Sequence, residues 1–333
     1  MTGLVLITGA GGFIGGQLVR QLEQQGMVVR AVDRKPLENW FYKSLTAENL
    51  IYDLQNKDAC YAAVRGADQV YNLAADMGGM GFIENNKALC MLSVLINTHL
   101  LMAAREHGVS RFFFASSACV YPDYLQRDSK MEGLKESTAY PAMPEDGYGW
   151  EKLFSERMCR HFREDFGITT RIARYHNVYG PFGTWDGGRE KAPAAISRKV
   201  ATAVLTGNPE IEIWGDGEQT RSFMYIDDCL KGTMMLMNSD FTEPLNIGSD
   251  EMVSINQLVD IIEGFGGVKL KRKYNLNAPK GVRGRNSDND LIKQVLDWAP
   301  SITLRDGLET TYRWIYHQVK ARAEGRPFVA AYE

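Results

Sequence analysis

The 333-residue sequence lacks the cysteine and histidine arrangements that mark metal sites and disulfide frameworks. Its five cysteines are widely spaced and odd in number, and no two of them form a C-x-x-C pair. Such spacing is typical of reduced thiols in a cytoplasmic protein. The five histidines also lack the spacing of metal ligands. We therefore expect a cytoplasmic protein without a metal site.

The sequence also lacks a strong net charge and a long apolar run. Its net charge of −3 gives no indication of a nucleic-acid partner. We find no apolar run long enough to cross a bilayer, so we expect no membrane partner. Residues 4–7 lead directly into glycines with no basic segment before them, unlike a signal peptide. The composition, 44% apolar and 24% charged, is ordinary for a globular protein, and the length allows two domains.

A glycine cluster near the N-terminus is the first positive feature. Residues 9–15 have the pattern G-x-x-G-x-x-G and follow a short apolar run at 4–8. A helical pattern follows at 17–25, and a second apolar run at 28–32 ends in Asp33. Strand, glycines, helix, strand and acid in this order predict a dinucleotide-binding unit.

The chemistry of this unit favours NAD. Glycines let the backbone approach a pyrophosphate closely, and the helix that follows directs its N-terminal amides at the phosphates. Asp33 can accept hydrogen bonds from the adenosine ribose hydroxyls, which favours NAD over NADP. Arg34 follows it, and an arginine at this place can also hold a 2′-phosphate.

The pattern of strands and helices continues through the first half of the chain. Further strands are predicted at 69–73, 111–115 and 169–174, and helices at 92–105 and 148–166. This alternation predicts an α/β fold with a Rossmann-type, doubly wound parallel sheet.

Tyr148 and Lys152 have i, i+4 spacing and would share one face of the predicted helix. With the glycine motif, Asp53-Leu54, 73–75 and Ser116-Ser117, this pair makes residues 1–180 resemble the extended short-chain dehydrogenase/reductase family. The resemblance implies that Tyr148 is the acid/base on a substrate hydroxyl. It also implies that Lys152 binds the nicotinamide ribose and lowers the pKa of the tyrosine. The implied NAD-binding residues are Gly9, Gly12, Phe13, Ile14, Gly15, Asp33, Asp53, Leu54, Leu73, Ala74, Ala75, Tyr148 and Lys152.

A narrower resemblance covers nearly the whole chain. Segments 73–82, 116–122, 183–193, 214–223 and 281–288 are similar to the GDP-mannose 3,5-epimerase family. The resemblance implies that Cys119 and Lys191 form an acid/base pair and that a GDP-sugar is the substrate. The implied substrate-binding residues are Gly78, Ser117, Ala118, Cys119, Asn177, Glu190, Lys191, Ala192, Lys199, Gln219, Thr220, Arg221 and Arg285, the last as a clamp on the diphosphate.

The residue types suit the chemistry that this resemblance implies. Tyr148 would take the proton of the sugar C4 hydroxyl while NAD takes hydride, and the resulting ketone acidifies the hydrogens at C3 and C5. Inversion then needs one group to remove a proton and another to deliver one to the opposite face. The ordinary pKa is about 8.5 for a thiol and about 10.4 for a lysine, and local charge and desolvation can bring both closer to about 7. Return of the hydride recycles NAD.

The expected reaction converts GDP-D-mannose to GDP-L-galactose, with GDP-L-gulose as a side product of inversion at C5 alone. We expect an NAD-binding domain at 1–174 plus about 222–245. Residues 175–221 and 246–333 would form a smaller nucleotide-sugar-binding domain, with the active site between the two. We expect segments 223–229 and 245–246 to return to the large sheet. By resemblance, we also expect a homodimer joined through the helices near 92–106 and 149–166.

Two alternatives remain open. The chain could epimerise or dehydrate another nucleotide sugar, or it could be a non-catalytic NAD-binding regulatory protein. The similar 4,6-dehydratases carry an acidic pair where this chain has Ala118-Cys119, and a simple 4-epimerase would leave Cys119 and Lys191 unexplained. The intact Tyr148 and Lys152 argue against a regulatory protein.

Overall fold

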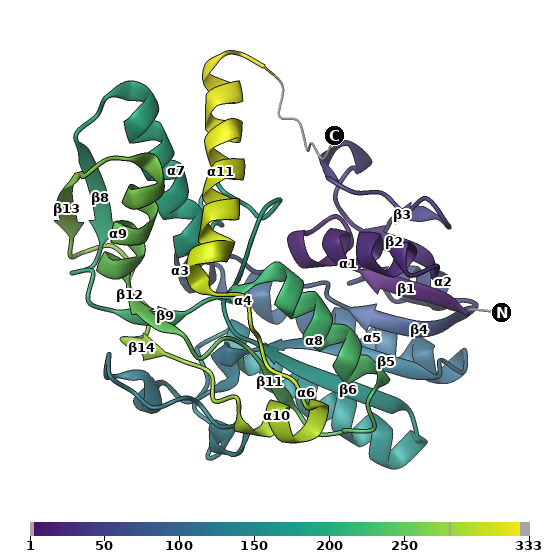
Figure 1. The fold of residues 1–333 in the computed structure, drawn as a ribbon. Coiled ribbons are helices and arrows are strands. Elements are labelled where there is room, and N and C mark those ends of the chain that lie inside the picture. Colours follow the sequence, from purple (N-terminus) through teal and green to yellow (C-terminus); the bar gives the residue numbers. More distant parts are fainter. Residues whose placement is uncertain (1–2, 280, 327–333) are drawn as a thin grey trace.

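A seven-stranded parallel sheet is the centre of the computed structural model, which describes residues 3–279 and 281–326. The strand order is β11-β6-β5-β4-β1-β2-β3, which reverses direction between β1 and β4, the usual place of a ligand in doubly wound folds. The predicted fold class is therefore confirmed (Figure 1). The strands are β1 (Leu4–Thr8), β2 (Val28–Asp33), β3 (Asn49–Ile51), β4 (Ala67–Asn72), β5 (Arg111–Ser117), β6 (Thr169–Tyr175) and β11 (Leu245–Ile247).

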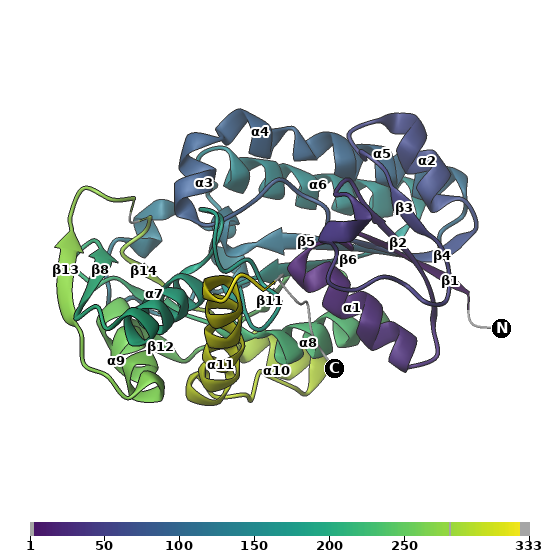
Figure 2. The same cartoon turned by 90° about the horizontal axis from the view of Figure 1, so that it is seen from above.

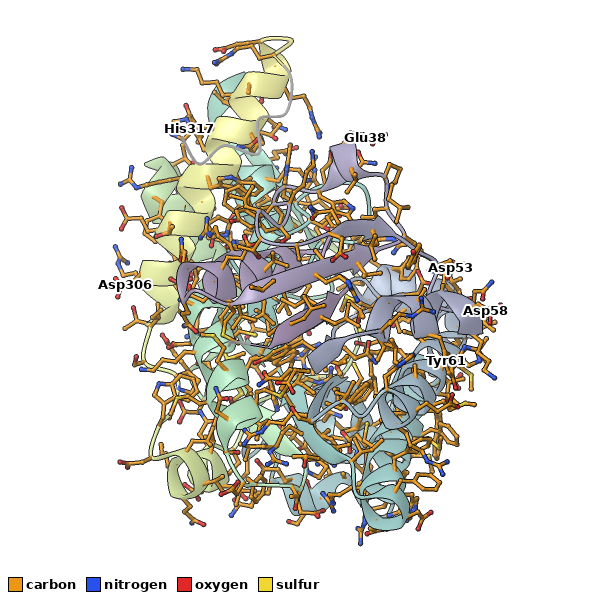
Figure 3. All side chains as sticks on the ribbon, turned by 90° about the vertical axis from the view of Figure 1, so that its right-hand side faces the viewer. Glu38, Asp53, Asp58, Tyr61, Asp306 and His317 are labelled. Atoms are coloured by element: carbon orange, nitrogen blue, oxygen red, sulfur yellow. The ribbon has the colours of Figure 1, made fainter. Side chains whose placement is uncertain are left out.

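Helices cover both faces of this sheet, as Figure 2 shows from above. On one face lie α2 (Lys57–Val64), α5 (Ser93–Glu106) and α6 (Tyr148–Phe166), and on the other α1 (Phe13–Gln24) and α8 (Ile226–Asn238). Because side chains alternate along a strand, β5 supplies both layers. Phe112 and Phe114 join one apolar cluster and Phe113 joins the other. Polar side chains, among them Asp58, Asp306 and His317, cover the outside (Figure 3).

A smaller unit stands beside the carboxyl edge of the sheet. Its helices are α7 (Ala192–Thr206), α9 (Ile255–Gly266) and α11 (Leu304–Ala323). Its strands form two small sheets, β12-β9-β14 and β13-β8, from β8 (Glu210–Trp214), β9 (Thr220–Ser222), β12 (Met252–Ser254), β13 (Lys271–Asn275) and β14 (Gly284–Arg285).

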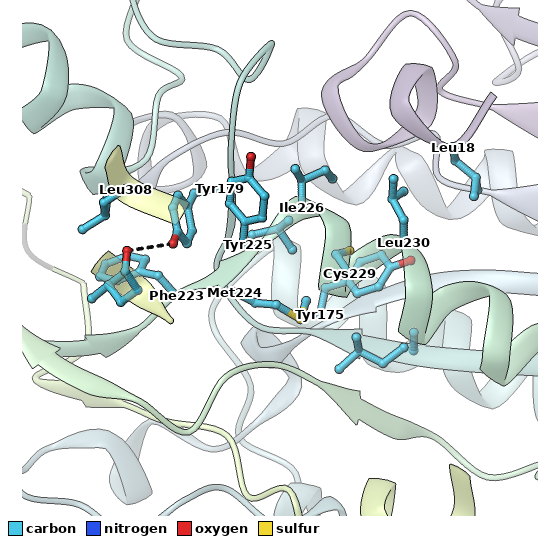
Figure 4. Packing of buried hydrophobic residues seen from close by; sticks show 14 of the residues in the cluster. Leu18, Tyr175, Tyr179, Phe223, Met224, Tyr225, Ile226, Cys229, Leu230 and Leu308 are labelled. Carbon is cyan, nitrogen blue, oxygen red and sulfur yellow. Dashed lines mark hydrogen bonds between the residues drawn. The ribbon is translucent and has the colours of Figure 1, made fainter. Parts of the chain in front are cut away.

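One continuous apolar cluster joins the two units. Figure 4 shows Tyr175 of β6 in this cluster with Tyr179, Phe223 and Leu308 of α11. The Tyr179 hydroxyl donates to the carbonyl of Leu304, 3.2 Å away, at the start of α11. The small unit is thus fixed to the sheet by packing as well as by the chain connections. The other elements are α3 (Met80–Asn85), α4 (Lys87–Met91), β7 (Val178–Tyr179), β10 (Met224–Tyr225), α10 (Asp290–Leu296) and the 3-10 helices η1 (Leu37–Asn39), η2 (Ala118–Val120), η3 (Asp123–Gln126) and η4 (Glu136–Ala139).

Two expectations from the sequence need correction. Segment 223–229 was expected to join the large sheet, but among residues 3–279 and 281–326 β10 pairs only with β7, and α8 begins at Ile226. Residues 245–246 do join it, because β11 pairs with β6. Within the described residues, the stretch Lys87–Glu106 is long and apolar enough by composition to cross a membrane, contrary to the expectation. In the structure 44% of that window is buried against the rest of the protein, and a single such stretch is weak evidence for a membrane span.

Some of the expected second domain, residues 327–333, lies outside the described residues.

A buried ion pair joins α6 to strands β5 and β6 of the sheet. Arg174 of β6 donates to both carboxylate oxygens of Glu156 at 2.9 and 2.7 Å, and Ser116 of β5 donates to the same carboxylate at 2.6 Å. The side chains of Arg174 and Glu156 are 3% and 4% exposed.

We expect Glu156→Gln to lower the free energy of unfolding by about 3 kcal/mol, because it leaves the arginine buried without its counter-charge. Chemical denaturation measures this loss. The control, Glu164→Gln, removes an exposed partner of Arg160 and should cost no more than about 0.5 kcal/mol. Equal losses in the two variants would contradict the prediction.

Candidate active site

A cavity lies between the sheet and the small unit. Its walls come from the carboxyl end of β5, the start of α6, the loop before α7, and strands β8, β9 and β14. Clefts at the carboxyl edge of a parallel sheet are the usual ligand sites of such folds. The sequence-predicted position between the two units is where this cavity is found.

Cys119 lies in η2, immediately after β5, and is 5% exposed. Its amide donates to the Ser117 hydroxyl at 3.2 Å, and its sulfur accepts from Nη1 of Arg285 at 3.3 Å. A Cβ at Gly149 would lie 2.3 Å from the Cys119 carbonyl oxygen, so only glycine allows α6 to begin this close. This approach places Tyr148 and Cys119 in one cavity and in one small apolar cluster.

Tyr148 and Lys152 occupy the first turns of α6 and are both buried. The Lys152 ammonium lies 5.4 Å from the centre of the Tyr148 ring and 3.5 Å from a Glu151 carboxylate oxygen. Burial raises the pKa of Tyr148 well above its ordinary value, with Cys119 acting in the same direction and a hydrogen bond with Ser117 opposing it. The resemblance implied that Lys152 lowers the pKa of Tyr148, whereas in this structure burial raises it.

Lys191 is the last residue before α7 and lines the same cavity. Desolvation lowers its pKa, Cys119 acts against this shift, and Arg285 adds to it. The direction is the one that the sequence argument required of an acid/base lysine near neutral pH.

The loop that carries Lys191 is tied to two helices by ion pairs. Arg198 of α7 lies 3.3 Å from the Asp186 carboxylate and 2.9 Å from that of Glu190. Arg322 of α11 also pairs with Asp186. These ion pairs connect the loop of Lys191 to α7, which follows it, and to α11.

Cations gather at one side of the cavity. Arg285 is buried and donates from Nε to Gln126 at 2.6 Å. Burial lowers the pKa of Arg221 to about 9, and the nearby Arg285 adds to this effect. Burial also lowers the pKa of Lys199, whose ammonium donates to the Glu212 carbonyl at 2.8 Å. Desolvated cations of this kind favour a bound anion, because an anion restores the charge balance that water would otherwise supply.

The structure brings nearly all of the predicted substrate residues to this cavity. Thr220 is the exception, because it is absent from the lining and its hydroxyl donates to the Ser129 carbonyl at 2.6 Å. The residues that line the cavity as predicted are Gly78, Ser117, Ala118, Cys119, Asn177, Glu190, Lys191, Ala192, Lys199, Gln219, Arg221 and Arg285.

The sequence argument missed several lining residues. Met77 and Gly79 lie inside the quoted 73–82 segment, and Trp214 opens the 214–223 segment, so the motifs contained them without assigning a role. A Cβ at Gly79 would lie 2.6 Å from the Glu190 carbonyl oxygen, which shows how closely the two loops meet. Glu212 carried no signal of its own beyond alternation along β8.

The glycine turn has the geometry that a dinucleotide needs. Gly9 has φ of +73°, and a Cβ there would lie 2.9 Å from the Leu73 carbonyl. Gly12 begins α1 without a side-chain cap, which leaves the amides from Phe13 and Ile14 onward available to phosphate. A Cβ at Gly15 would lie 2.1 Å from the Gly9 carbonyl oxygen, so Gly9 and Gly15 are sterically required, whereas a Cβ at Gly12 would meet that oxygen at 3.1 Å.

The other predicted NAD-binding residues surround this turn. Asp33 ends β2, and its carboxylate accepts from the Gly11 amide at 3.0 Å. Asp53 and Leu54 follow β3, and Figure 3 shows Asp53 on the same side of the molecule as Asp58 and Tyr61 of α2. Leu73, Ala74 and Ala75 follow β4 on the other side of β1. These residues therefore fit NAD along the carboxyl edge of the sheet.

The fold and site define a class of nucleotide-sugar enzyme, and comparison with known proteins agrees. The model of the NAD dependent epimerase/dehydratase family matches residues 5–248, and the chain belongs to this family. NAD is accordingly its cofactor.

Particular relatives lie within this family. Over 323 residues the chain is 50% identical to GDP-mannose 3,5-epimerase 1 of rice (Oryza sativa subsp. japonica) and 49% identical to GDP-mannose 3,5-epimerase of Arabidopsis thaliana. Each alignment covers 96% of this chain and 84% of the relative. A solved UDP-glucose 4-epimerase of Thermotoga maritima, with UDP-glucose, has a TM-score of 0.85 at 24% identity, covering 94% of this chain and 99% of that one. The resemblance indicated by the sequence motifs is confirmed.

The desolvation of Lys191 predicts an effect on stability. Because its pKa is lowered in the folded state, the charged form is favoured in the unfolded chain, and the wild type loses stability as pH falls below the ordinary lysine pKa of about 10.4. We therefore expect Lys191→Met to raise Tm at pH 7 by a few degrees, and by less at pH 10.5. Thermal unfolding at the two pH values measures the difference.

The exposed Lys130 provides the matched control, and Lys130→Met should leave Tm within about one degree at both pH values. A Lys191→Met variant that is less stable than wild type at pH 7 would show that the lysine is not penalised by burial.

Proposed function

We propose that the protein epimerises GDP-D-mannose at C3 and C5 to give GDP-L-galactose, with GDP-L-gulose formed when only C5 inverts. One observation carries this proposal: Tyr148, Cys119 and Lys191 line the same cavity. Three proton-transfer groups are more than a simple dehydrogenase or 4-epimerase requires. The two plant relatives at about 50% identity, both called GDP-mannose 3,5-epimerase, support the choice of substrate.

The tyrosine performs the first and last proton transfers. NAD, when bound, would supply the hydride acceptor and donor for the oxidation and reduction of C4. Tyr148 removes the proton from the C4 hydroxyl as C4 is oxidised, and it returns that proton when C4 is reduced. The raised pKa of Tyr148 in the structure favours the neutral phenol. The proposed reaction therefore requires a positive charge close to the phenol oxygen, which would lower this pKa again.

Cys119 and Lys191 act on the carbons beside the ketone. One removes a proton from one face of the 4-keto sugar, the resulting enolate is held in the cavity, and the other delivers a proton to the opposite face. The two residues come from separate elements, η2 and the loop before α7, so they can lie on opposite faces of a bound ring. The lowered pKa of Lys191 suits transfer near neutral pH.

The cations of the small unit hold the diphosphate. Arg285 offers a buried guanidinium, with Arg221 close enough for their charges to interact. Two guanidinium groups match the geometry of phosphate oxygens. The half-exposed Trp214 and the carboxylate of Glu212 lie further along the cavity wall on β8 and would receive the base.

Solvent exchange tests the reaction directly. We expect deuterium from D2O to enter C3 and C5 of GDP-mannose, and NMR of the sugar protons measures this exchange. The Cys119→Ala substitution should reduce the exchange rate at least about 100-fold. Cys90→Ala is the matched control, because Cys90 is buried in the same apolar cluster but does not line the cavity. Its exchange should stay within a few-fold of wild type.

The outcomes separate the alternatives. Exchange into another nucleotide sugar but not GDP-mannose would favour an enzyme of different substrate. Stoichiometric NAD binding without exchange into any sugar would favour a regulatory protein and would overturn the proposal.

We also propose a homodimer formed through α5 and α6. Exposed apolar side chains gather on these neighbouring helices and on α4, namely Met91, Leu92, Leu95, Trp150 and Phe154. Contiguous exposed apolar side chains on packed helices are typical of a subunit interface.

All five cysteines are buried free thiols, which supports the further proposal of a cytoplasmic location.

The double substitution Leu95→Glu with Phe154→Glu should convert the dimer to a monomer, because it places like charges on both copies of the interface. Analytical ultracentrifugation measures the change. Leu45→Glu is the control, since Leu45 is exposed on another part of the surface and the dimer should persist. A dimer that survives the double substitution would contradict the assigned interface.

A further inference from the structure

An ion pair connects two loops at the carboxyl edge of the sheet. Arg34, the residue after β2, donates to both carboxylate oxygens of Asp76, with Nη1 3.0 Å from Oδ2. Asp76 follows β4 and the Leu73–Ala75 segment. The Asp76 side chain is 3% exposed, whereas that of Arg34 is 47% exposed. A buried carboxylate therefore holds an arginine whose side chain remains about half exposed.

The strand order gives this pair its position. β1 lies between β2 and β4, so a contact between the loops after β2 and β4 must pass across the carboxyl end of β1. The glycine turn at 9–12 begins at that end. A dinucleotide follows the same route, with its ribose at the acid that ends β2 and its pyrophosphate over the glycine turn. The Arg34 guanidinium thus lies along the path of the pyrophosphate.

Several contacts fix the segment that carries Arg34. Asp33 accepts from the Gly11 amide at 3.0 Å, and the Lys35 ammonium donates to the Gly11 carbonyl at 3.1 Å. The Trp40 ring packs so closely on the turn that a Cβ at Gly11 would lie 2.6 Å from the indole nitrogen. The residues on either side of Arg34 are therefore fixed to the glycine turn, and the Arg34 side chain is itself held by Asp76.

Asp76 is fixed independently from the other side. Its amide donates to the Ser93 hydroxyl of α5 at 3.0 Å, in a buried environment. A guanidinium has five N–H donors, and the pair with Asp76 uses two of them, so three remain for a ligand. This arrangement favours a planar cation aimed at an anion, because Asp76 restricts the arginine without consuming its hydrogen-bonding capacity.

We propose that Arg34 binds the pyrophosphate of NAD and that Asp76 is the positioning residue that holds its guanidinium there. The pair retains the cofactor between turnovers. Retention matters here because the reaction returns the hydride to the sugar, so an enzyme that released NAD in mid-reaction would lose its intermediate. The inference rests on NAD binding and not on the identity of the sugar.

The same geometry decides between the two cofactors. Arg34 was the one feature of the sequence that favoured a 2′-phosphate. Its side chain instead reaches toward Asp76 beyond β1, away from the ribose hydroxyls that Asp33 would contact. The proposal therefore predicts that Arg34 contributes to NAD and NADP binding alike, through the phosphates that both share.

The test measures NAD binding without any sugar. Protein freed of cofactor is titrated with NAD⁺ by calorimetry, and the dissociation rate is followed by protein fluorescence. Because Arg34→Met alone leaves a buried carboxylate unpaired, the main variant combines Arg34→Met with Asp76→Asn. We expect it to weaken NAD⁺ binding about tenfold or more, mostly through faster dissociation. Asp76→Asn alone should have a smaller effect on NAD⁺ binding, because it keeps the Arg34 cation but removes the carboxylate that orients it.

Arg30→Met is the matched control, because Arg30 lies on β2 and pairs with Glu48 without crossing β1. It should leave the Kd for NAD⁺ within twofold of wild type. Arg34→Lys keeps a charge but cannot form the bidentate pair, and it should bind NAD⁺ with intermediate affinity, which provides a test if the double variant unfolds.

Three results would overturn the proposal. One is a double variant with wild-type NAD⁺ affinity, and another is a variant that binds NAD⁺ more tightly, as a blocking pair would predict. The third is a loss confined to NADP⁺, which would place Arg34 at a 2′-phosphate. A failure to epimerise GDP-mannose with normal effects on NAD⁺ binding would overturn the proposed function and leave this inference intact.

Discussion

The close approach of Gly149 to the Cys119 carbonyl is the contact on which the rest of the site depends. Any side chain at position 149 would push α6 away from the end of β5, because a Cβ would lie 2.3 Å from that oxygen. α6 carries Tyr148 and Lys152, and η2 carries Cys119, so this one backbone contact sets the separation of the two candidate proton-transfer groups, Tyr148 and Cys119. The buried pair of Arg174 and Glu156 then holds α6 from behind.

The electrostatics of the cavity follow from burying several cations together. Desolvation lowers the pKa of Lys191, Lys199 and Arg221, and it raises that of Tyr148. Each shift disfavours the charged form of its group. The buried cations of the free site are therefore energetically unfavourable, and a bound diphosphate would stabilise them. Binding energy from the nucleotide, far from the sugar, can in this way prepare the groups that react with the sugar.

Much of the fold could be predicted because its determinants are local. The glycine turn, the strands around it and α6 depend on neighbouring residues, and their bounds agree with the sequence argument to within a few residues. The prediction that segment 223–229 joins the large sheet was wrong, because its apolar residues suit a buried strand and a buried helix equally well. The partner of Arg34 lies 42 positions away and becomes visible only when the strand order is known.

The candidate site was predictable to a similar extent and for similar reasons. Motifs pointed to residues whose types suit a particular chemistry, such as Cys119 and Lys191, and both line the cavity. They did not identify wall residues such as Trp214 and Glu212, whose role depends on where β8 lies. The direction of the pKa shift at Tyr148 also escaped the sequence, since burial depends on the whole fold.

The ion pairs around Asp186 give the end of the chain an unexpected importance. Arg322 on α11 reaches Asp186, which in turn contacts Arg198 beside the loop of Lys191. Helix α11 is therefore connected through ion pairs to the loop that carries the candidate acid/base amine. A fusion partner or an immobilisation surface attached at α11 would therefore act on the loop of Lys191 through these ion pairs without touching the cavity.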